Sequence, residues 1–348
     1  MRLFNVELIR FWSRRITWVT MAVVAACMLF GVGIAFTQTS ADEPTGAGPR
    51  QTTNPDCVAD LTAARDSGDD PELAGLSDEE IADRFCTFFE DSDDRRFFAT
   101  DILGFGQVED WSDSRESESQ RGTIRVEGVQ YEAPNFGLEG ILPGIGVFLL
   151  IVAVVLGGSY VGAEYRSGTV ENLLLWEPRR GRVLVTKNVA GFLSGFTVQT
   201  VLLVFFAALL LALAQFRGTF QGVDGRFWLD LVGVIIRAAL MAGCFFVLAM
   251  AIAGLAKNTT AAVVALLGWF VVSNILIELL VPQVRQFELF SNAGAFIGLG
   301  DVGRYVGSDS NRALVLSHGP WLGAVVTAIW ALLPAGLALG LFVRRDVT

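Results

Sequence analysis

Six runs of about twenty or more predominantly apolar residues constrain the fold more than any other feature of the sequence. An α-helix rises about 1.5 Å per residue, so about 20 apolar residues are needed to cross about 30 Å of hydrocarbon. Lipid cannot satisfy an open backbone, so each run is predicted to be helical. The predicted spans are 16–38, 141–161, 188–214, 229–255, 261–281 and 321–343. We therefore expect an all-α polytopic membrane protein with six transmembrane helices.

The charge of the chain divides into two unlike parts. Residues 39–140 carry 25 Asp and Glu against 8 Arg, a net charge of −17. The rest of the chain carries 11 acidic and 18 basic residues, a net charge of +7, together with nearly all the long apolar runs. The segment 39–140 is therefore predicted to be an acidic, water-soluble insert between the first and second spans.

The distribution of basic residues predicts the orientation in the membrane. Short flanks on one side of the spans carry 12 Lys and Arg, whereas the short loops on the other side carry five. Because Lys and Arg collect on the cytoplasmic side, both termini are expected in the cytoplasm and the insert outside it. Two lysines against 24 arginines, with abundant Ala and Gly, are typical of a GC-rich bacterial genome, so the expected location is the bacterial cell membrane.

The segment 1–15, before the first span, is predicted to be an amphipathic helix in the membrane interface. Its apolar residues recur at helical spacing: Phe4, Leu8, Phe11 and Trp12. Glu7, Arg10 and Arg14 are expected on the opposite face. The alternative is a short basic flank with chance periodicity. A cleaved signal peptide is the alternative for the first span, but its 21-residue apolar core exceeds the usual length of about 7–15 residues.

The insert 39–140 is expected to have a mixed helical and irregular structure. Ser77 and Glu80 form a capping-box pattern that predicts a helix start. An apolar stripe is expected to follow on that helix: Ile81, Phe85, Phe88 and Phe89. The alternating segment 124–131 favours one short strand.

The insert contains two cysteines, Cys57 and Cys86, on the side predicted to be oxidising. We expect a disulfide between them, which would close a loop of about 30 residues and stabilise the insert by about 3–4 kcal/mol. The alternative is two free thiols.

Residue counts exclude several kinds of catalysis. A P-loop needs Gly-Lys-Ser/Thr, but the two lysines, Lys187 and Lys257, follow Thr186 and Ala256. A zincin site needs two histidines, and His318, expected in an exposed loop, is alone. The chain is therefore not expected to be an enzyme, to bind a metal or cofactor, or to bind nucleic acid.

The segment 162–187, between the second and third spans, is too apolar for an ordinary solvated loop. Leu173, Leu174 and Trp176 precede Pro178, a helix breaker, and basic residues follow at Arg179, Arg180 and Arg182. An apolar patch with a basic rim favours a docking surface on the cytoplasmic side. The alternative is a basic loop that only obeys the positive-inside rule.

The same segment resembles the permease subunits of type 2 ABC transporters. The pattern is Gly-x-Glu-x-x-x-Gly-Thr, then a Leu pair, then Pro-x-Arg, then Lys before a span. The matching positions are Gly162, Glu164, Gly168, Thr169, Leu173, Leu174, Pro178, Arg180 and Lys187. The resemblance extends over the membrane part of the chain, from the N-terminal helix to Arg344-Arg345, but the long acidic insert departs from the minimal members.

This resemblance implies that the loop carries a coupling helix, which docks on a separate ABC-type ATP-binding subunit. That subunit would hold ATP and Mg. The residues expected to couple are Glu164, Arg166, Gly168, Thr169, Leu173, Leu174, Trp176, Pro178, Arg179, Arg180 and Lys187. The implied function is ATP-driven export by alternating access. The implied partners are the ATP-binding subunit, a second copy or a homologous permease, and membrane lipid.

Two charged residues lie inside predicted spans, Arg237 in 229–255 and Glu278 in 261–281. A charge in lipid is unfavourable and usually pairs or lines a water-filled path. We expect the two to pair or to line the outer part of the route. The alternative is that both extend to the outer interface.

The segment 282–320 is too apolar for a free loop and is expected to contain short interfacial or re-entrant helices. Two other function classes remain open at this point. The first is a polytopic receptor or assembly factor whose acidic ectodomain binds a partner. The second is a secondary transporter, although no inverted repeat is obvious and the charges lie toward one edge.

Overall fold

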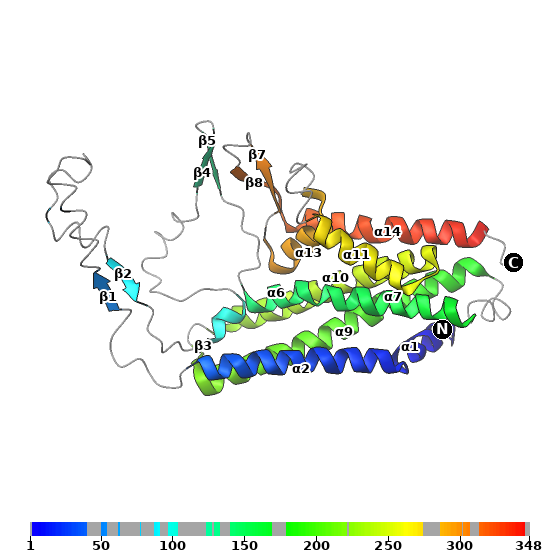
Figure 1. Ribbon diagram of the computed structural model, residues 1–348, viewed down its shortest axis with the longest axis horizontal. Helices are drawn as coiled ribbons and strands as arrows, with labels where there is room; N and C mark the ends of the chain where they lie inside the picture. The colour runs from blue at the N-terminus through cyan, green and yellow to red at the C-terminus, as the bar shows by residue number, and fades with distance from the viewer. Residues whose placement is uncertain are drawn as a thin grey trace.

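The protein is a bundle of long helices with short strands at one end (Figure 1). The computed structural model describes residues 2–39, 50–53, 62, 77, 87–90, 97–103, 123–126, 129–132, 140–168, 179–220, 223–273, 286–300, 302–306 and 313–344. Figure 1 places the start of α1 and the end of α14 together at one end of the bundle. The strands gather at the opposite end.

Five helical segments in the described residues are long and apolar enough to cross a membrane. They are α2 (Arg15–Gln38), α6 with α7 (Ile141–Phe148 and Leu150–Ser167), α9 (Arg180–Arg217), α10 (Gly225–Ala256) and α14 (Pro320–Arg344). Together they make this a multi-pass membrane protein. The predicted span 261–281 is represented by α11 (Thr259–Val272), which has 14 residues and is too short alone. Residues 274–285 lie outside the described part, so the six-span count stays a prediction.

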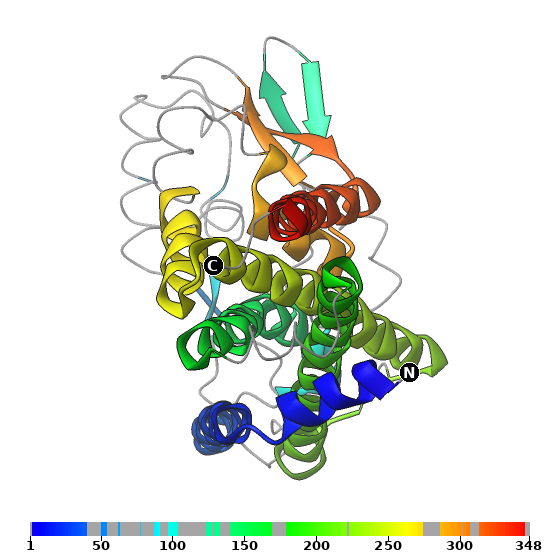
Figure 2. The ribbon, with the colours of Figure 1, turned by 90° about the vertical axis from the view of Figure 1, so that its right-hand side faces the viewer.

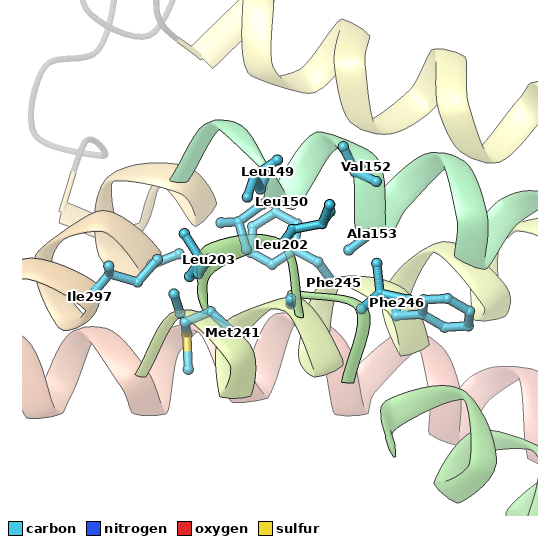
Figure 3. Close-up of a cluster of buried hydrophobic side chains, with 14 of the residues drawn as sticks. Leu149, Leu150, Val152, Ala153, Leu202, Leu203, Met241, Phe245, Phe246 and Ile297 are labelled. Atoms are coloured by element: carbon cyan, nitrogen blue, oxygen red, sulfur yellow. The ribbon is translucent and has the colours of Figure 1, made fainter. Parts of the chain in front are cut away.

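Helix α10 forms the centre of the bundle and packs on α7, α9 and α14. Its Phe245 and Phe246 are fully buried among leucines of α7 and α9, as Figure 3 shows. Glycines permit these close approaches. A Cβ added at Gly157 would lie 2.5 Å from the carbonyl oxygen of Phe246, and one at Gly195 would lie 3.0 Å from that of Ala242. Two small positions therefore let α7 and α9 press directly on the backbone of α10.

Helix α2 lies at the edge of the bundle and packs mainly along α9 (Figure 2). Of its 24 residues, Thr17 and Met28 are buried. Large apolar side chains such as Trp18 and Phe30 are more than half exposed. A helix that is apolar on all sides and exposed on most of them faces lipid. The same holds for the outer face of α14, where Leu332 and Leu333 are exposed.

Parts of the acidic insert form strands that the sequence did not predict. Strand β1 (Arg50–Thr53) pairs antiparallel with β2 (Thr87–Glu90). Phe88 and Phe89 therefore lie in a strand, and their assignment to the stripe of a helix was wrong. The remainder of that predicted helix lies almost entirely outside the described residues.

The alternating segment 124–131 forms two strands instead of the single strand predicted. Strand β4 (Thr123–Val126) and strand β5 (Val129–Glu132) pair antiparallel, with Val126 opposite Val129. Two residues separate them, which is the length of a tight hairpin loop. The hairpin lies beside β8 (Ala313–His318).

Another part of the insert packs against the end of the helix bundle. Strand β3 (Phe97–Phe98) pairs in parallel with β6 (Gly218–Thr219), which follows α9 directly. The short helix η1 (Ala99–Ile102) then packs on α6 and α9, with Ala99 and Ile102 fully buried. The insert is therefore joined to the membrane helices through apolar burial at this point.

The segment 282–320 contains one short helix, α13 (Leu289–Gly298), and a hairpin that was not expected. The hairpin joins β7 (Val302–Val306) to β8 (Ala313–His318). Helix α13 is mostly buried against α14, α10 and α6. Its N-cap is Glu288, whose buried carboxylate accepts hydrogen bonds from the amide of Ser291 and, at 3.0 Å, from the hydroxyl of Ser273.

Asn292 of α13 organises a polar cluster at this end of the bundle. Its side-chain nitrogen donates to the carbonyl oxygens of Gln286 (2.9 Å) and Glu288 (2.6 Å). Its side-chain oxygen lies 2.9 Å from Nε2 of His318. His318 therefore ends a strand and contacts a buried amide, so its assignment to an exposed loop was wrong. We call Ser273, Glu288, Asn292 and His318 the outer cluster.

Candidate functional site

The ends of the predicted coupling loop are helical, so the loop is shorter than 162–187. Helix α7 continues to Ser167, and α9 begins at Arg180. Gly168 terminates α7 in the left-handed conformation, with φ +65°, and its amide donates to the carbonyl oxygen of Glu164. Glycine adopts this conformation without steric penalty, which makes it the usual residue after a helix end. Glu164 and Lys187 consequently lie on two helices that border the loop.

Glu164 and Lys187 form a buried ion pair between α7 and α9. The exposed fractions of the two side chains are 7% and 6%. The other carboxylate oxygen of Glu164 lies 3.3 Å from the guanidinium of Arg14, the residue before α2. Arg14 also donates to the carbonyl oxygens of Ser159 (3.3 Å) and Tyr160 (2.9 Å) of α7. One carboxylate therefore joins both borders of the loop to the start of α2.

Helix α1 (Arg2–Trp12) contributes a second carboxylate to the same place. The side chain of Glu7 is 1% exposed and lies 3.8 Å from Nζ of Lys187. The hydroxyl of Tyr160 donates to this carboxylate. Arg10 pairs with Glu7 at 3.3 Å from the exposed side. Lys187 thus lies between two carboxylates, one from α1 and one from α7.

We call Glu7, Arg14, Tyr160, Glu164 and Lys187 the inner cluster. Two carboxylates face two cations, so the charges balance. The ring of Tyr160 lies 4.7 Å from the guanidinium carbon of Arg14 and 5.3 Å from Nζ of Lys187, and both cations gain from its π-face. Removing one partner from such a buried set leaves an uncompensated charge, which is strongly unfavourable. The cluster therefore fixes α1, α2, α7 and α9 in one arrangement.

Aromatic side chains pack against the inner cluster. Phe11 of α1 is 2% exposed and makes edge-on ring contacts with Tyr160 of α7 and Phe246 of α10. Aromatic pairs of this geometry contribute about 0.5–1.5 kcal/mol beyond their buried area. Helix α1 is therefore held to the bundle by both ion pairs and rings, and it is more than a surface attachment.

A second contact beside the loop depends on Gly162, the first residue of the recognised pattern. A Cβ at Gly162 would lie 2.5 Å from the amide nitrogen of Thr259. Thr259 begins α11, and the side chain of Asn258 caps that helix by accepting from the amide of Thr260 at 2.9 Å. The glycine thus allows the start of α11 to touch α7 two residues before Glu164.

The other predicted coupling residues are exposed or fall outside the described part. Arg166 and Arg179 are exposed, and Arg180 is the first residue of α9. The residues outside the described part are Thr169, Leu173, Leu174, Trp176 and Pro178. The structure thus brings together Glu164 and Lys187, and the roles of the remaining residues stay predictions.

Sequence reasoning missed three members of the inner cluster, Glu7, Arg14 and Tyr160. Glu7 was expected on the polar face of α1, and this was wrong. Phe4 and Phe11 stand three and four residues from Glu7, so helical periodicity itself places Glu7 on the face they share. That spacing was the available signal. Arg14 and Tyr160 had no local signal, because their partners are distant in sequence.

The remaining predicted sites are only partly within the described residues. Arg237 donates from Nε to the carbonyl oxygen of Ile297, 2.9 Å away, near the end of α13. A Cβ at Gly233 would lie 2.9 Å from the guanidinium, so this glycine makes room for the head of Arg237. Glu278, Cys57 and Cys86 lie outside the described part. The Arg237–Glu278 pair and the disulfide therefore stay predictions.

Comparison with known proteins identifies the family. A search of curated proteins gave no match. The family described as "ABC-2 family transporter protein" matches residues 1–347. The match covers α1, the membrane helices, the acidic insert and the inner cluster alike. The chain therefore belongs to the ABC-2 transporter family, as a permease subunit of an ABC transporter.

Proposed function

We propose that this chain is the permease of an ATP-driven exporter and that its inner cluster transmits the movement of a separate ATP-binding subunit. The movement of that subunit has to reach the permease through a part of the chain that does not bend. The segment between Gly168 and Arg179 is bordered by helices whose ends are joined by the Glu164–Lys187 pair. This ion pair is the observation that carries the proposal, because a force on the segment reaches α7 and α9 together.

The cluster gives that force a path to further helices. Arg14 links Glu164 to α2, and Glu7 links Lys187 to α1. Buried groups with balanced charges resist separation, so the four helices move as one unit rather than individually. A push on the loop would therefore tilt the cytoplasmic end of the bundle, which is the movement that alternating access requires.

The proposal extends to the remaining parts of the assembly. ATP and Mg are held by the partner subunit, and this chain binds no cofactor. A second copy or a homologous permease supplies the other half of the route. Leu173, Leu174 and Trp176 anchor the partner, with Arg179 and Arg180 at the rim, because apolar anchors with a charged rim are typical of docking surfaces. Both termini lie in the cytoplasm of a bacterium, and the acidic insert lies outside.

Coupling can be separated from docking with two single variants. The permease is purified together with the ABC-type ATP-binding subunit encoded beside it, and the complex is reconstituted in vesicles. Leu174→Asp should abolish co-purification, because it places a charge in an apolar interface. Glu164→Gln should retain the partner but lose most of the difference in ATP hydrolysis between the complex and the free subunit.

Arg226→Gln is the matched control, since Arg226 is an exposed residue at the start of α10. It should leave both measurements unchanged. Normal stimulation of ATP hydrolysis in Glu164→Gln would overturn the role of the inner cluster. Undiminished co-purification of Leu174→Asp would overturn the docking surface, and movement of substrate toward the side on which ATP is supplied would overturn export.

A further inference from the structure

A groove between α2, α6 and α9 lies on the membrane surface of the bundle and has no part in the proposed function. It encloses about 320 Å³ and is lined by apolar side chains and glycine. On α2 the lining runs from Val24 to Ala35, and Phe148 and Phe206 form the other walls. Cys27 and Phe148 are exposed, so the groove opens sideways on the surface that faces lipid.

We propose that this groove binds one acyl chain of an anionic phospholipid from the surrounding bilayer, with the headgroup at Arg217. The proposal goes beyond the transport function and does not depend on it. The lining carries no charged residue, so it offers nothing to a polar ligand but matches a hydrocarbon chain.

The length of the groove fits the hydrocarbon of one leaflet. Val24 and Ala35 are eleven positions apart on a continuous helix, which corresponds to about 17 Å at 1.5 Å per residue. Half of the hydrocarbon thickness of a bilayer is about 15 Å. An acyl chain that lies along α2 would therefore fill the groove from the headgroup level to the midplane.

A basic side chain, that of Arg217, lies near the end of the groove that Ala35 lines. Arg217 is the last residue of α9, and its guanidinium lies 4.3 Å from the ring of Phe36 and 3.4 Å from the carbonyl oxygen of Thr39. Ala35 ends the lining on α2. Phe36 follows it on the same helix, and Thr39 is the residue just after the end of the helix. Within the described residues, no carboxylate forms an ion pair with Arg217. A lipid phosphate would supply the missing anion.

Gly31 provides a direct way to block the groove. It lies in the lining, and a Cβ added there would meet no atom within 4 Å. Gly31→Leu therefore fills the groove without a clash. Gly33→Leu is the matched control, because Gly33 lies on the same helix, is exposed, has equally open space and does not line the groove. Both changes raise helix propensity equally.

The test is photolabelling of the full-length protein in vesicles of phosphatidylcholine and phosphatidylglycerol. The probe is a phosphatidylglycerol with a diazirine on its acyl chain, and the labelled peptides are mapped by mass spectrometry. Residues 24–35 and 141–149 should be labelled more strongly than the exposed face of α14. Gly31→Leu should reduce this labelling to the level of the exposed face of α14, because the leucine side chain occupies the space of the acyl chain. Gly33→Leu should not reduce it.

The headgroup is tested with Arg217→Gln and a phosphatidylcholine probe. The preference for phosphatidylglycerol should fall about fivefold, which is the contribution of one basic residue near an anionic lipid surface. Equal labelling of the groove and α14, or undiminished labelling of Gly31→Leu, would overturn the proposal. So would oxidative crosslinking of two copies through Cys27 with an unlabelled groove, because a second copy would then occupy it. An unchanged lipid preference in Arg217→Gln would overturn the assigned headgroup site.

Discussion

The inner and outer clusters are both buried and polar, but they are built in different ways. The inner cluster contains two carboxylates and two cations from four helices, and each carboxylate contacts a cation. The outer cluster is organised by Asn292, which has hydrogen bonds to two backbone carbonyls and to His318, and its one carboxylate, Glu288, accepts from the neutral hydroxyl of Ser273 and the amide of Ser291. Full charges act over longer distances than neutral dipoles and are harder to separate in a medium of low dielectric constant.

This difference between the two clusters predicts that the two ends of the bundle differ in stiffness. Breaking the inner cluster leaves a buried charge, so the helices that share it keep one arrangement. Breaking a neutral hydrogen bond costs less, and its partners can find water. The end that carries the loop is therefore predicted to be the stiffer one, and α13 is predicted to be the easier element to move. Four predictions test this contrast, each by an unfolding titration of purified protein in mixed micelles unless stated otherwise.

Lys187→Met should have the largest effect. It leaves Glu7 and Glu164 without their shared cation, so unfolding should become easier by about 3–5 kcal/mol. Adding Glu164→Gln should restore part of the loss, because Lys187→Met leaves two carboxylates with Arg14 as the one cation of the cluster, and the second change restores the balance of charge. Lys257→Met is the control, since Lys257 is the other lysine and is exposed. If the double variant were no more stable than Lys187→Met, the ionic account of the inner cluster would fail.

Gly162→Ala should rank second. The added methyl group lies too close to the backbone of Thr259 and forces α7 away from α11, with an expected loss of about 3 kcal/mol. Gly254→Ala is the matched control, because the nearest atom to its new Cβ is Val161 Cγ1, at an ordinary 3.8 Å. Equal stability of the two variants would show that the close approach at the inner end does not matter.

Asn292→Ala should rank third and tests the outer cluster. Loss of the amide leaves its partners to find other donors and acceptors, so we expect a loss of about 1–2 kcal/mol. Hydrogen exchange should also accelerate in α13 while α1 and α9 stay protected. Asn5→Ala, at an exposed position of α1, is the control. A loss as large as that of Lys187→Met would remove the distinction between the clusters.

Asp230→Asn should have the smallest effect on the free energy of unfolding, and it serves as the reference for an exposed ion pair. Asp230 lies 3.9 Å from Arg226, with side-chain exposures of 38% and 87%. A pair of this kind in a helix contributes about 0.3–0.5 kcal/mol. A double-mutant cycle with Arg226→Gln measures it. A coupling above about 1 kcal/mol would mean that burial is not what distinguishes the inner cluster.

Local sequence patterns predicted the parts of the fold that depend on local physics. The long apolar runs correspond to helices because hydrocarbon leaves the backbone no other arrangement. Gly162, Glu164 and Lys187 were recognised through a family pattern, and all three border the loop. Glu7, in contrast, carries a charge that suggested exposure, although its spacing from Phe4 and Phe11 places it on the face of α1 that the neighbouring helices bury. Strands β1, β2 and β3 of the insert depend on pairing between distant segments, which periodicity cannot show.

Helix α2 has a consequence for the order of synthesis. It leaves the ribosome well before its main partner, α9, which is completed only at Arg217. At about 5–20 residues per second, roughly 9–36 s pass between the ends of the two helices. Because α2 is apolar on every side, it can remain alone in lipid during that interval. The position of α2 at the edge of the bundle therefore suits a helix that enters the membrane before its partner α9 has been synthesised.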